Sequence, residues 1–323
     1  MKSVPKPKVV SLFAGAGGLD LGFAQAGFEI IWANDIDSDS VDTYRQNLGD
    51  HIVLGDIQEV DSDDIPYADV VLGGFPCQGF SRANRFRSVE DSRNALYLEF
   101  VRVVKDKQPR CFIAENVRGI LSLDGGNVIQ MIVEDFEKVG YEVEYKLFNL
   151  ADFGVPQQRR RVIIMGTRKD VAEKSKPRFP EPTHTNKVDL FDLERWKSIG
   201  EALAGIPDPD LAQGELPNHV YSKYKVEFRD FTGHRPTDPS KPSPTILARG
   251  NGGGGVCAIP HPNGKRRLSV RESASVQTFP LDFEFTGSLN SMYRQIGNAV
   301  PVLFARLLAE SVLEAFETTE VHA

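Results

Sequence analysis

The stretch VVSLFAGAGG, residues 9–18, decides the fold that the sequence predicts. Its apolar first half predicts a short buried strand, and its glycine-rich second half is a turn in which backbone N–H groups can approach a ligand. Leu19 and Phe23 then recur at helical spacing, and Gly27 is expected to end the helix. A strand, a glycine turn and a helix open a doubly wound α/β fold, although Asp20 stands where the dinucleotide pattern has its last glycine.

Two further apolar segments end in acidic residues. Residues 29–35 predict a strand that ends at Asp35, 20 positions after Gly15, and residues 51–56 predict a strand that ends at Asp56. A carboxylate at such a strand end accepts hydrogen bonds from ribose hydroxyls, so an adenosine-containing ligand fits across these ends. The fold alone leaves a nicotinamide cofactor open, and Asp56 taken alone is equally explained as a helix N-cap or a turn residue.

The segment GGFPCQGFS, residues 73–81, follows an apolar run at residues 70–72 and puts Cys77 where a strand ends and a loop begins. Ligands bind and chemistry occurs at that edge of an open α/β sheet. The preceding proline is rigid, and the flanking glycines leave room for close approach. For an arbitrary cysteine the usual interpretation is a small buried residue at a turn, and only the motifs elsewhere in the chain decide against it.

The composition bounds the remaining options. With 323 residues, of which 41% are hydrophobic, the chain can form a core and roughly two domains. It has no apolar run near the roughly 18 residues of a membrane span, no signal-peptide hydrophobic region, and only three widely spaced cysteines. We therefore expect a cytoplasmic protein with no membrane contact, no disulfide framework and no metal site.

The charge distribution leaves nucleic-acid binding open. The net charge of −7 argues mildly against it, since duplex-binding faces are basic. However, basic residues cluster at 82–93, 159–161 and 265–267, so a locally positive cleft on an acidic protein remains compatible with the sequence.

Four motifs resemble, in the same order, those of the cytosine-C5 DNA methyltransferases. They are PCQ at 76–78, ENV at 115–117, QQRRR at 157–161 and QIGNAVP at 295–301. The resemblance covers most of the chain and implies a DNA (cytosine-5-)-methyltransferase of the bacterial restriction-modification type. It also implies a Rossmann-like methyltransferase sheet, with S-adenosylmethionine as cofactor and S-adenosylhomocysteine as product.

The resemblance assigns the catalytic roles. Carbon 5 of cytosine is a poor nucleophile, and addition of the Cys77 thiolate at carbon 6 would make it reactive. Glu115 would bind the ring nitrogen and the amino group of the cytosine and carry a proton. Arg159 and Arg161 would approach the cytosine oxygen and brace the site.

The resemblance also implies the cofactor residues. Asp35 would hold the ribose, Ile36 would pack on the adenine, and Asp56 would accept a hydrogen bond from the adenine amino group. The other implied cofactor residues are Phe13, Ala14, Gly15, Gly17, Gly18, Ile57, Pro76, Leu96, Asn298 and Val300.

Double-stranded DNA is the implied substrate. A cytosine inside a duplex is out of reach of Cys77, so the base must flip out, and residues 79–93 are predicted to form a lid over it. The implied DNA-binding residues are Ser81, Arg82, Arg85, Arg87, Gln157, Thr245, Ile246, Arg249 and Gly250. The DNA sequence that is recognised, and the cytosine in it, cannot be deduced from these residues.

We expect two domains. Residues 1–172 together with about 286–323 would form the catalytic and cofactor-binding domain, because a helix after Pro301 would return to it. Residues from about 173 to 285 would form a smaller, irregular, β-rich target-recognition domain. Within that segment Ser269 and Glu272 predict a capping box at a helix start.

Three alternatives remain open. A related enzyme of the same fold methylates tRNA, but the long segment at 173–265 favours duplex DNA. A zinc cytosine deaminase needs a second cysteine at position 80, where this chain has Phe80. A non-catalytic DNA-binding module would not need Cys77, Glu115 and Arg161 together. We further expect a monomer, with a cognate restriction endonuclease acting at the same site without a stable complex.

Overall fold

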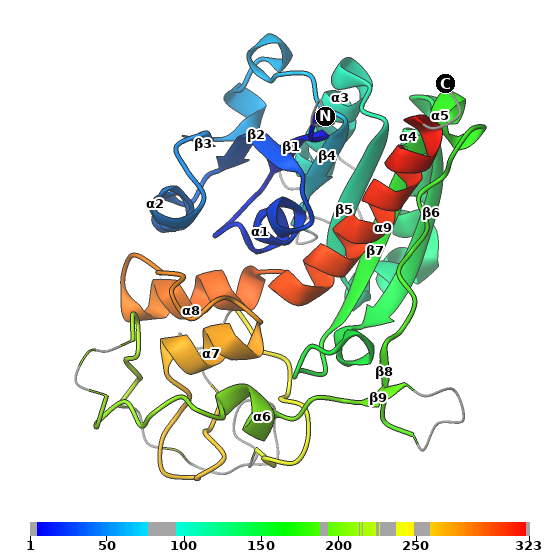
Figure 1. Cartoon of the computed structure of the whole chain (residues 1–323). Coiled ribbons are helices and arrows are strands. Elements are labelled where there is room, and N and C mark those ends of the chain that lie inside the picture. Colours follow the sequence, from blue (N-terminus) through cyan, green and yellow to red (C-terminus); the bar gives the residue numbers. More distant parts are fainter. Residues whose placement is uncertain are drawn as a thin grey trace.

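The computed structural model describes residues 5–76, 95–187, 193–212, 214, 216–223, 226, 237–248 and 259–320. Figure 1 shows a large lobe built on a sheet and, below it, a smaller lobe that carries α6 (Ile199–Leu203), α7 (Val270–Val276) and α8 (Leu289–Asn298). Both chain ends lie on the side of the sheet away from the smaller lobe.

The large lobe alternates strands and helices along the chain. Its strands are β1 (Lys8–Leu12), β2 (Glu29–Asp35), β3 (Ile52–Leu54), β4 (Val70–Gly73), β5 (Cys111–Val117), β6 (Tyr141–Asn149) and β7 (Arg160–Arg168). Its helices are α1 (Gly18–Gln25), α2 (Ser38–Asn47), α3 (Ala95–Lys107), α4 (Asn127–Lys138), α5 (Lys169–Ala172) and α9 (Val302–Glu320). Short 3-10 helices are η1 (Ile57–Glu59), η2 (Ser62–Asp64), η4 (Arg118–Gly126) and η5 (Leu150–Phe153).

The strand order of the sheet is β3-β2-β1-β4-β5-β7-β6. The pairs β1–β2, β2–β3, β1–β4 and β4–β5 are parallel, whereas β7 runs antiparallel to both β5 and β6. The chain builds outward from β1 to β3 and then returns to add β4 on the other side of β1. This reversal of strand order opens a crevice at the carboxyl ends of β1 and β4, where ligands bind in such sheets. The doubly wound α/β prediction is confirmed.

Alternate residues of the central strands enter two different cores. On β5, Phe112 and Ala114 pack with residues of α3 and α4, whereas Cys111 and Ile113 pack with residues of α1 and α9. The strands β4 and β7 alternate between the two cores in the same way. Because helices cover both faces, these strands appear in the sequence as continuous apolar runs.

The last helix returns to the large lobe. Helix α9 begins directly after Pro301, whose carbonyl accepts a hydrogen bond from the backbone of Ala305 at 3.0 Å. Its residues Val312 and Phe316 are buried in the core that α1 also covers, so α1 and α9 lie against each other. The expected packing of this helix on the first part of the chain is therefore observed.

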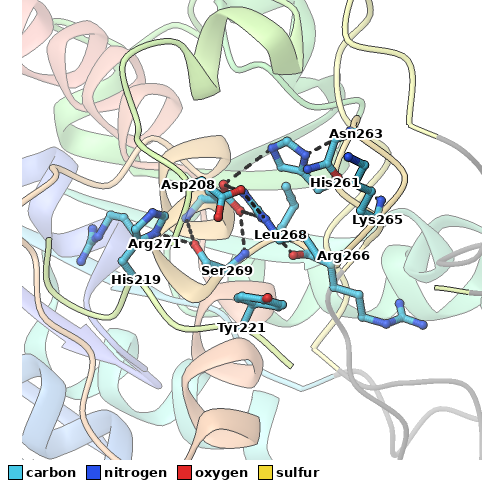
Figure 2. A network of polar contacts seen from close by, with 12 residues as sticks. Asp208, His219, Tyr221, His261, Asn263, Lys265, Arg266, Leu268, Ser269 and Arg271 are labelled. Atoms are coloured by element: carbon cyan, nitrogen blue, oxygen red, sulfur yellow. Dashed lines mark hydrogen bonds and ion pairs between the residues drawn. The ribbon is translucent and has the colours of Figure 1, made fainter. Parts of the chain in front are cut away.

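A network of polar contacts holds the smaller lobe together (Figure 2). Ser269 and Glu272 form the predicted capping box at the start of α7. Both carboxylate oxygens of Glu272 also accept hydrogen bonds of 2.7 Å from the guanidinium of Arg266. Ser269 Oγ lies 2.9 Å from Nδ1 of His219, which ties the segment before α7 to a distant part of the lobe. The polar side chains of this network therefore have hydrogen-bond partners, as buried polar groups normally do.

The described part of the expected recognition domain has little strand. Beside α6 and α7 it contains β8 (His184–Thr185) and β9 (Glu194–Arg195), two residues each, and isolated bridges. This arrangement is irregular, as expected. The β-rich character and the domain boundaries stay predictions.

A methyl group at Gly166 should test how tightly β7 packs on β5. A Cβ atom there would lie 1.9 Å from Cε1 of Phe112, whose ring stacks on Phe136 at a centroid distance of 4.1 Å and cannot move away freely. Gly166→Ala should therefore lower the free energy of unfolding by about 1–3 kcal/mol, measured by urea denaturation.

Gly119→Ala is the matched control, because the added Cβ would meet only Val117 Cγ2 at 3.9 Å. Equal stability of the two variants would show that the Phe112 ring can move away from position 166, so that β7 does not pack tightly on β5.

Candidate active site

A cavity of about 750 Å³ opens at the carboxyl ends of β1, β2, β4 and β5. Twelve of the thirteen predicted cofactor residues line it: Phe13, Ala14, Gly15, Gly18, Asp35, Ile36, Asp56, Ile57, Pro76, Leu96, Asn298 and Val300. Gly17 does not line the cavity and instead precedes α1 in a left-handed conformation (φ 83°). Glu115, Arg161 and Ile246 complete the wall. The strand ends therefore bring together residues that are far apart in the sequence.

Asp35 organises the glycine turn at the floor of the cavity. One carboxylate oxygen accepts a hydrogen bond from the backbone N–H of Gly15 at 2.7 Å, and the other accepts from Asp37 at 2.8 Å. Burial raises the pKa of Asp35, and these two backbone hydrogen bonds oppose the rise. Each oxygen keeps a further lone pair with which it can bind a ligand hydroxyl.

Phe13 has a backbone that side chains rarely adopt. Its φ of 54° lies in the left-handed region, where a bulky residue is strained. The strain brings Phe13 to the cavity wall at the turn between β1 and α1. Strained residues of this kind cluster at ligand sites, and here the residue was also one of the predicted cofactor residues.

Asp56 and Ile36 form the far side of the cavity. Asp56 caps η1 by accepting a hydrogen bond from the N–H of Gln58 at 3.0 Å, so the N-cap interpretation is correct, and the residue lines the cavity as well. The Ile36 side chain is 68% exposed although it is apolar. An apolar side chain at a cavity mouth offers contact area to an apolar ring of a ligand.

Glu115 and Arg161 form an ion pair on neighbouring strands. The distance from Arg161 Nε to Glu115 Oε1 is 2.5 Å, and both side chains are 12% exposed. The geometry is not that of a hydrogen bond, so these two buried atoms lack a hydrogen-bond partner among the described residues. Buried polar atoms are normally paired, and a ligand in the cavity could provide the missing partners.

The backbone next to this pair is held in place. Asn116 donates a hydrogen bond from Nδ2 to the carbonyl oxygen of Phe75 at 2.9 Å. Pro76 follows and lines the cavity, so the chain leaves the described region directly beside Glu115. Cys77, the next residue, lies outside the described residues, as do Ser81, Arg82, Arg85, Arg87, Arg249 and Gly250.

Arg159 has a different environment from Arg161. Its side chain is fully buried and donates hydrogen bonds to the carbonyl oxygens of Ile246 at 3.0 Å, Gly297 at 2.9 Å and Ala299 at 3.0 Å. Burial, followed by the charge of Arg161, lowers the pKa of Arg159. The guanidinium thus joins β7 to two segments that wall the cavity, and it does not itself line the cavity.

The predicted DNA-binding residues near Arg159 also have protein partners. Gln157 is fully buried, accepts a hydrogen bond from the N–H of Ile246 at 2.9 Å and donates to Gln277 at 2.9 Å. Ile246 is 1% exposed, whereas Thr245 is half-buried and donates to the carbonyl of Gln158 at 2.6 Å. These contacts join the two lobes, and a role in DNA contact stays a prediction.

Asp20 is part of the site, and the sequence analysis treated it only as a departure from a pattern. Its buried carboxylate accepts hydrogen bonds from Ser11 at 2.7 Å and from Tyr44 at 2.9 Å, and Tyr44 in turn contacts His51 Nε2 at 3.0 Å. Burial raises the pKa of Asp20 to about 6, and the two hydrogen bonds oppose that rise. The signal in the sequence was an acidic residue inside an otherwise apolar helix start.

Arg294 is a second residue that the sequence analysis missed. It reaches from α8 across the cavity mouth and pairs with Asp37 at 2.8 Å. No local motif marks it, because the contact depends on how α8 is placed against the loop after β2.

Among the residues that the structure describes, no group of three or more His, Cys, Asp or Glu side chains could hold a metal ion. Among the same residues, no helix is both long and apolar enough to cross a membrane.

Comparison with known proteins shows which protein family the chain resembles. The family model "C-5 cytosine-specific DNA methylase" matches residues 7–314. Type II methyltransferase M.NgoFVII of Neisseria gonorrhoeae is 40% identical over 96% of this chain and 87% of its own length. Type II methyltransferase M.FnuDI of Fusobacterium nucleatum is 36% identical over 97% of this chain and 96% of its own length.

Solved structures share the fold at lower identity. A prophage-encoded protein of E. coli superposes with a TM-score of 0.74 and 24% identity, covering 97% of this chain and all of that one. The Dnmt2 methyltransferase of S. pombe gives a TM-score of 0.69 with 20% identity, covering 96% of this chain and 99% of that one.

Replacing Arg159 should weaken the contact between the two lobes and lower the stability of the protein. Arg159→Met removes hydrogen bonds to the carbonyl oxygens of Ile246, Gly297 and Ala299, of which Ala299 keeps a donor in Gln277 Nε2 at 3.3 Å, and the free energy of unfolding should fall by about 3 kcal/mol, measured by urea denaturation. Arg160→Met, at the exposed neighbouring position, is the control and should change stability by less than about 0.5 kcal/mol. A small effect of both substitutions would mean that the lobes are held by other contacts.

Asp20 should make stability depend on pH. Its pKa rises from 3.8 to about 6 on folding, so the folded chain binds a proton that the unfolded chain releases in that window. This contribution is fully present below pH 3.8 and is lost as pH rises through 6, about 3 kcal/mol in all. Asp20→Asn should remove this dependence in denaturation series run between pH 4 and 7.

Asp42→Asn, which changes an exposed carboxylate of α2, is the control for Asp20→Asn and should leave the pH profile unchanged. If the wild-type and Asp20→Asn profiles are parallel, Asp20 does not titrate in this window.

Proposed function

Since the chain belongs to the C-5 cytosine-specific DNA methylase family and is a DNA cytosine-5-methyltransferase, we propose that it acts through a covalent bond between Cys77 and carbon 6 of the target cytosine. The target would be a cytosine flipped out of a specific short duplex sequence. The observation that carries the proposal is the buried Glu115–Arg161 pair beside the backbone that leads into Cys77.

The cavity fits S-adenosylmethionine, the cofactor of this family. Asp35 and Asp56 offer carboxylate oxygens for ribose hydroxyls and for the adenine amino group, and both face the cavity. The exposed Ile36 side chain offers an apolar surface to the adenine, and Phe13 and Val300 lie at the wall of the same cavity. When bound, the cofactor supplies an electrophilic methyl group.

Residues of this chain would activate the cytosine. The Cys77 thiolate forms a bond to carbon 6, and the electron pair of the C5–C6 double bond shifts onto carbon 5 and is shared through carbon 4 with the ring nitrogen, which leaves carbon 5 nucleophilic. Glu115 would give a proton or a strong hydrogen bond to the ring nitrogen as charge builds there. Once carbon 5 is methylated, it loses its proton to a water molecule acting as base, the bond to Cys77 breaks as the C5–C6 double bond forms again, and the ring nitrogen returns its proton to Glu115.

The two arginines of the third motif would then have separate functions. Arg161, which lines the cavity, would stand at the cytosine oxygen and oppose the charge that develops there. Arg159, buried against three carbonyls, would brace the cavity wall. This division is supported by their different positions, since Arg161 lines the cavity whereas Arg159 is fully buried and does not line it.

The wider setting is part of the proposal. Relatives named as Type II methyltransferases support DNA methylation within a restriction-modification system. A monomer that acts on double-stranded DNA in the cytoplasm, beside a cognate endonuclease with which it forms no stable complex, stays a prediction. Residues 1–172 and about 286–323 would be the catalytic domain, and about 173–285 the target-recognition domain. The residues expected to contact DNA are Ser81, Arg82, Arg85, Arg87, Thr245, Arg249 and Gly250, together with Gln157 and Ile246, which in this structure are buried against protein.

Methyl transfer tests the reaction. We expect tritium from labelled S-adenosylmethionine to appear in 5-methylcytosine after incubation with unmethylated bacteriophage DNA and nucleoside analysis. Cys77→Ala should abolish the label while cofactor binding stays near wild type. Glu115→Gln, which keeps the shape but cannot carry the proton, should lower the rate by about 10²–10⁴-fold.

Cys111→Ala is the control for the thiol, because Cys111 is buried at the start of β5, at the opposite end of the strand from Glu115. Its activity should remain near wild type. Turnover by Cys77→Ala would refute the nucleophile assignment, and label in tRNA without label in DNA would refute the substrate assignment.

A further inference from the structure

A second hollow lies at the edge of the sheet opposite the candidate active site. It has a volume of about 450 Å³ and is formed where β1, β4 and β5 begin and β7 ends. We call it the basal groove, and the residues that matter in it are Lys8, Tyr67, Asp69, Lys107, Arg110 and Arg168. Because β7 is antiparallel to β5, its carboxyl end brings Arg168 to the same edge as the first residues of the other strands.

The basal groove is positively charged although the protein as a whole carries a net charge of −7. Four of its residues are cationic and one, Asp69, is acidic. Arg168 is paired with Asp170 at 2.7 Å, but in the part of the chain that the structure describes no ion pair involves Lys8, Lys107 or Arg110. Three cations that form no ion pair among the described residues therefore line one hollow, together with the carboxylate of Asp69, which accepts a hydrogen bond from the backbone N–H of Lys8 at 2.8 Å.

Lys107 is the least expected of these cations. Its residue is only 6% exposed, and its ammonium lies 4.7 Å from the ring centroid of Tyr67. Burying a charge without an anionic partner is costly, and contact with an aromatic face recovers only part of that cost. A place in the last turn of α3 favours a cation, yet it does not explain why Arg110, at the start of β5, points to the same hollow.

Arg110 and Tyr67 complete a binding surface. The guanidinium carbon of Arg110 lies 3.8 Å from the ring centroid of Phe316 in α9, which holds the guanidinium at the groove wall. A guanidinium fixed in this way suits a phosphate, because it can donate two parallel hydrogen bonds. Tyr67 is 73% exposed, so its ring offers contact area to a planar group beside the cations.

We propose that the basal groove binds a small phosphate-bearing ligand of the nucleotide class. Lys107, Arg110 and Lys8 would bind the phosphate, and Tyr67 would contact the base. The volume of the groove is within the range of small-molecule sites. A free nucleotide is favoured over duplex DNA because the groove and the cavity lie at opposite ends of the strands, so that DNA in the active site would not reach it.

Calorimetric titration of the whole protein tests the proposal. Guanosine 5′-monophosphate, inorganic phosphate and guanosine are the probes, and excess S-adenosylhomocysteine keeps adenosine-type binding in the cavity blocked. We expect one molecule of guanosine 5′-monophosphate to bind per chain, more tightly than phosphate or guanosine, and more weakly as salt rises. Lys107→Met and Arg110→Gln should each weaken this binding at least tenfold.

Matched variants make the result specific. Lys105→Met changes an exposed lysine in the same turn of α3 that does not line the groove, and it should bind like wild type. Lys8→Ala, at an exposed strand start, serves if Lys107→Met does not fold, and it should weaken binding at least threefold. Methyl transfer activity of Lys8→Ala should stay at the wild-type level, so failure of this proposal is separate from failure of the proposed reaction.

Three results would overturn the proposal. One is the absence of binding by both guanosine 5′-monophosphate and phosphate at millimolar concentration. Another is binding that Lys107→Met, Arg110→Gln and Lys8→Ala leave unchanged. The third is binding of duplex DNA, but not of the nucleotide, that these substitutions weaken, since the groove would then contact a second DNA segment.

Discussion

The contact between the two lobes depends on the buried guanidinium of Arg159. It donates hydrogen bonds to the carbonyl oxygens of Ile246 in the smaller lobe, of Gly297 in the last turn of α8 and of Ala299 directly after α8, while its own chain continues as β7 of the sheet. Arginine keeps its charge even where burial lowers its pKa, and it can serve several acceptors at once in a fixed plane. The segments that it joins form one wall of the cavity, so the shape of the site depends on a residue that does not itself touch the ligand space.

The other walls use the same kind of contact, in which a polar side chain fixes a backbone turn. Asp35 holds the glycine turn, Asn116 holds Phe75 next to Pro76, and Asp20 joins α1 to β1 through Ser11. With these turns held by the protein, Oε1 of Glu115 and Nε of Arg161 are in contact as an ion pair but have no hydrogen bond among the described residues. Charged groups that are already in position before the ligand binds can stabilise a charge that develops during the reaction.

Much of this could be predicted from local pattern. Apolar runs ending in Gly15, Asp35 and Asp56 predicted three strand ends, and the carboxyl ends of parallel strands meet at one edge whatever the details. The different burial of Arg159 and Arg161 could not be predicted in this way, because alternation puts both on one face and only long-range packing decides which one is covered. The same holds for Asp20 and Arg294, and for the basal groove, whose cations come from three separate places in the chain and which Arg168 joins because β7 runs antiparallel to β5.

The most direct test of the central claim is covalent capture on DNA that contains 5-fluorocytosine. Fluorine at carbon 5 cannot leave as a cation, so an enzyme that adds a thiolate at carbon 6 and methylates carbon 5 stays bound to the base. We predict a denaturation-resistant complex that forms only with S-adenosylmethionine, with the cross-link assigned by mass spectrometry to the peptide that contains Cys77. A cross-link at another residue, or none with a protein that methylates unmodified DNA, would contradict the account.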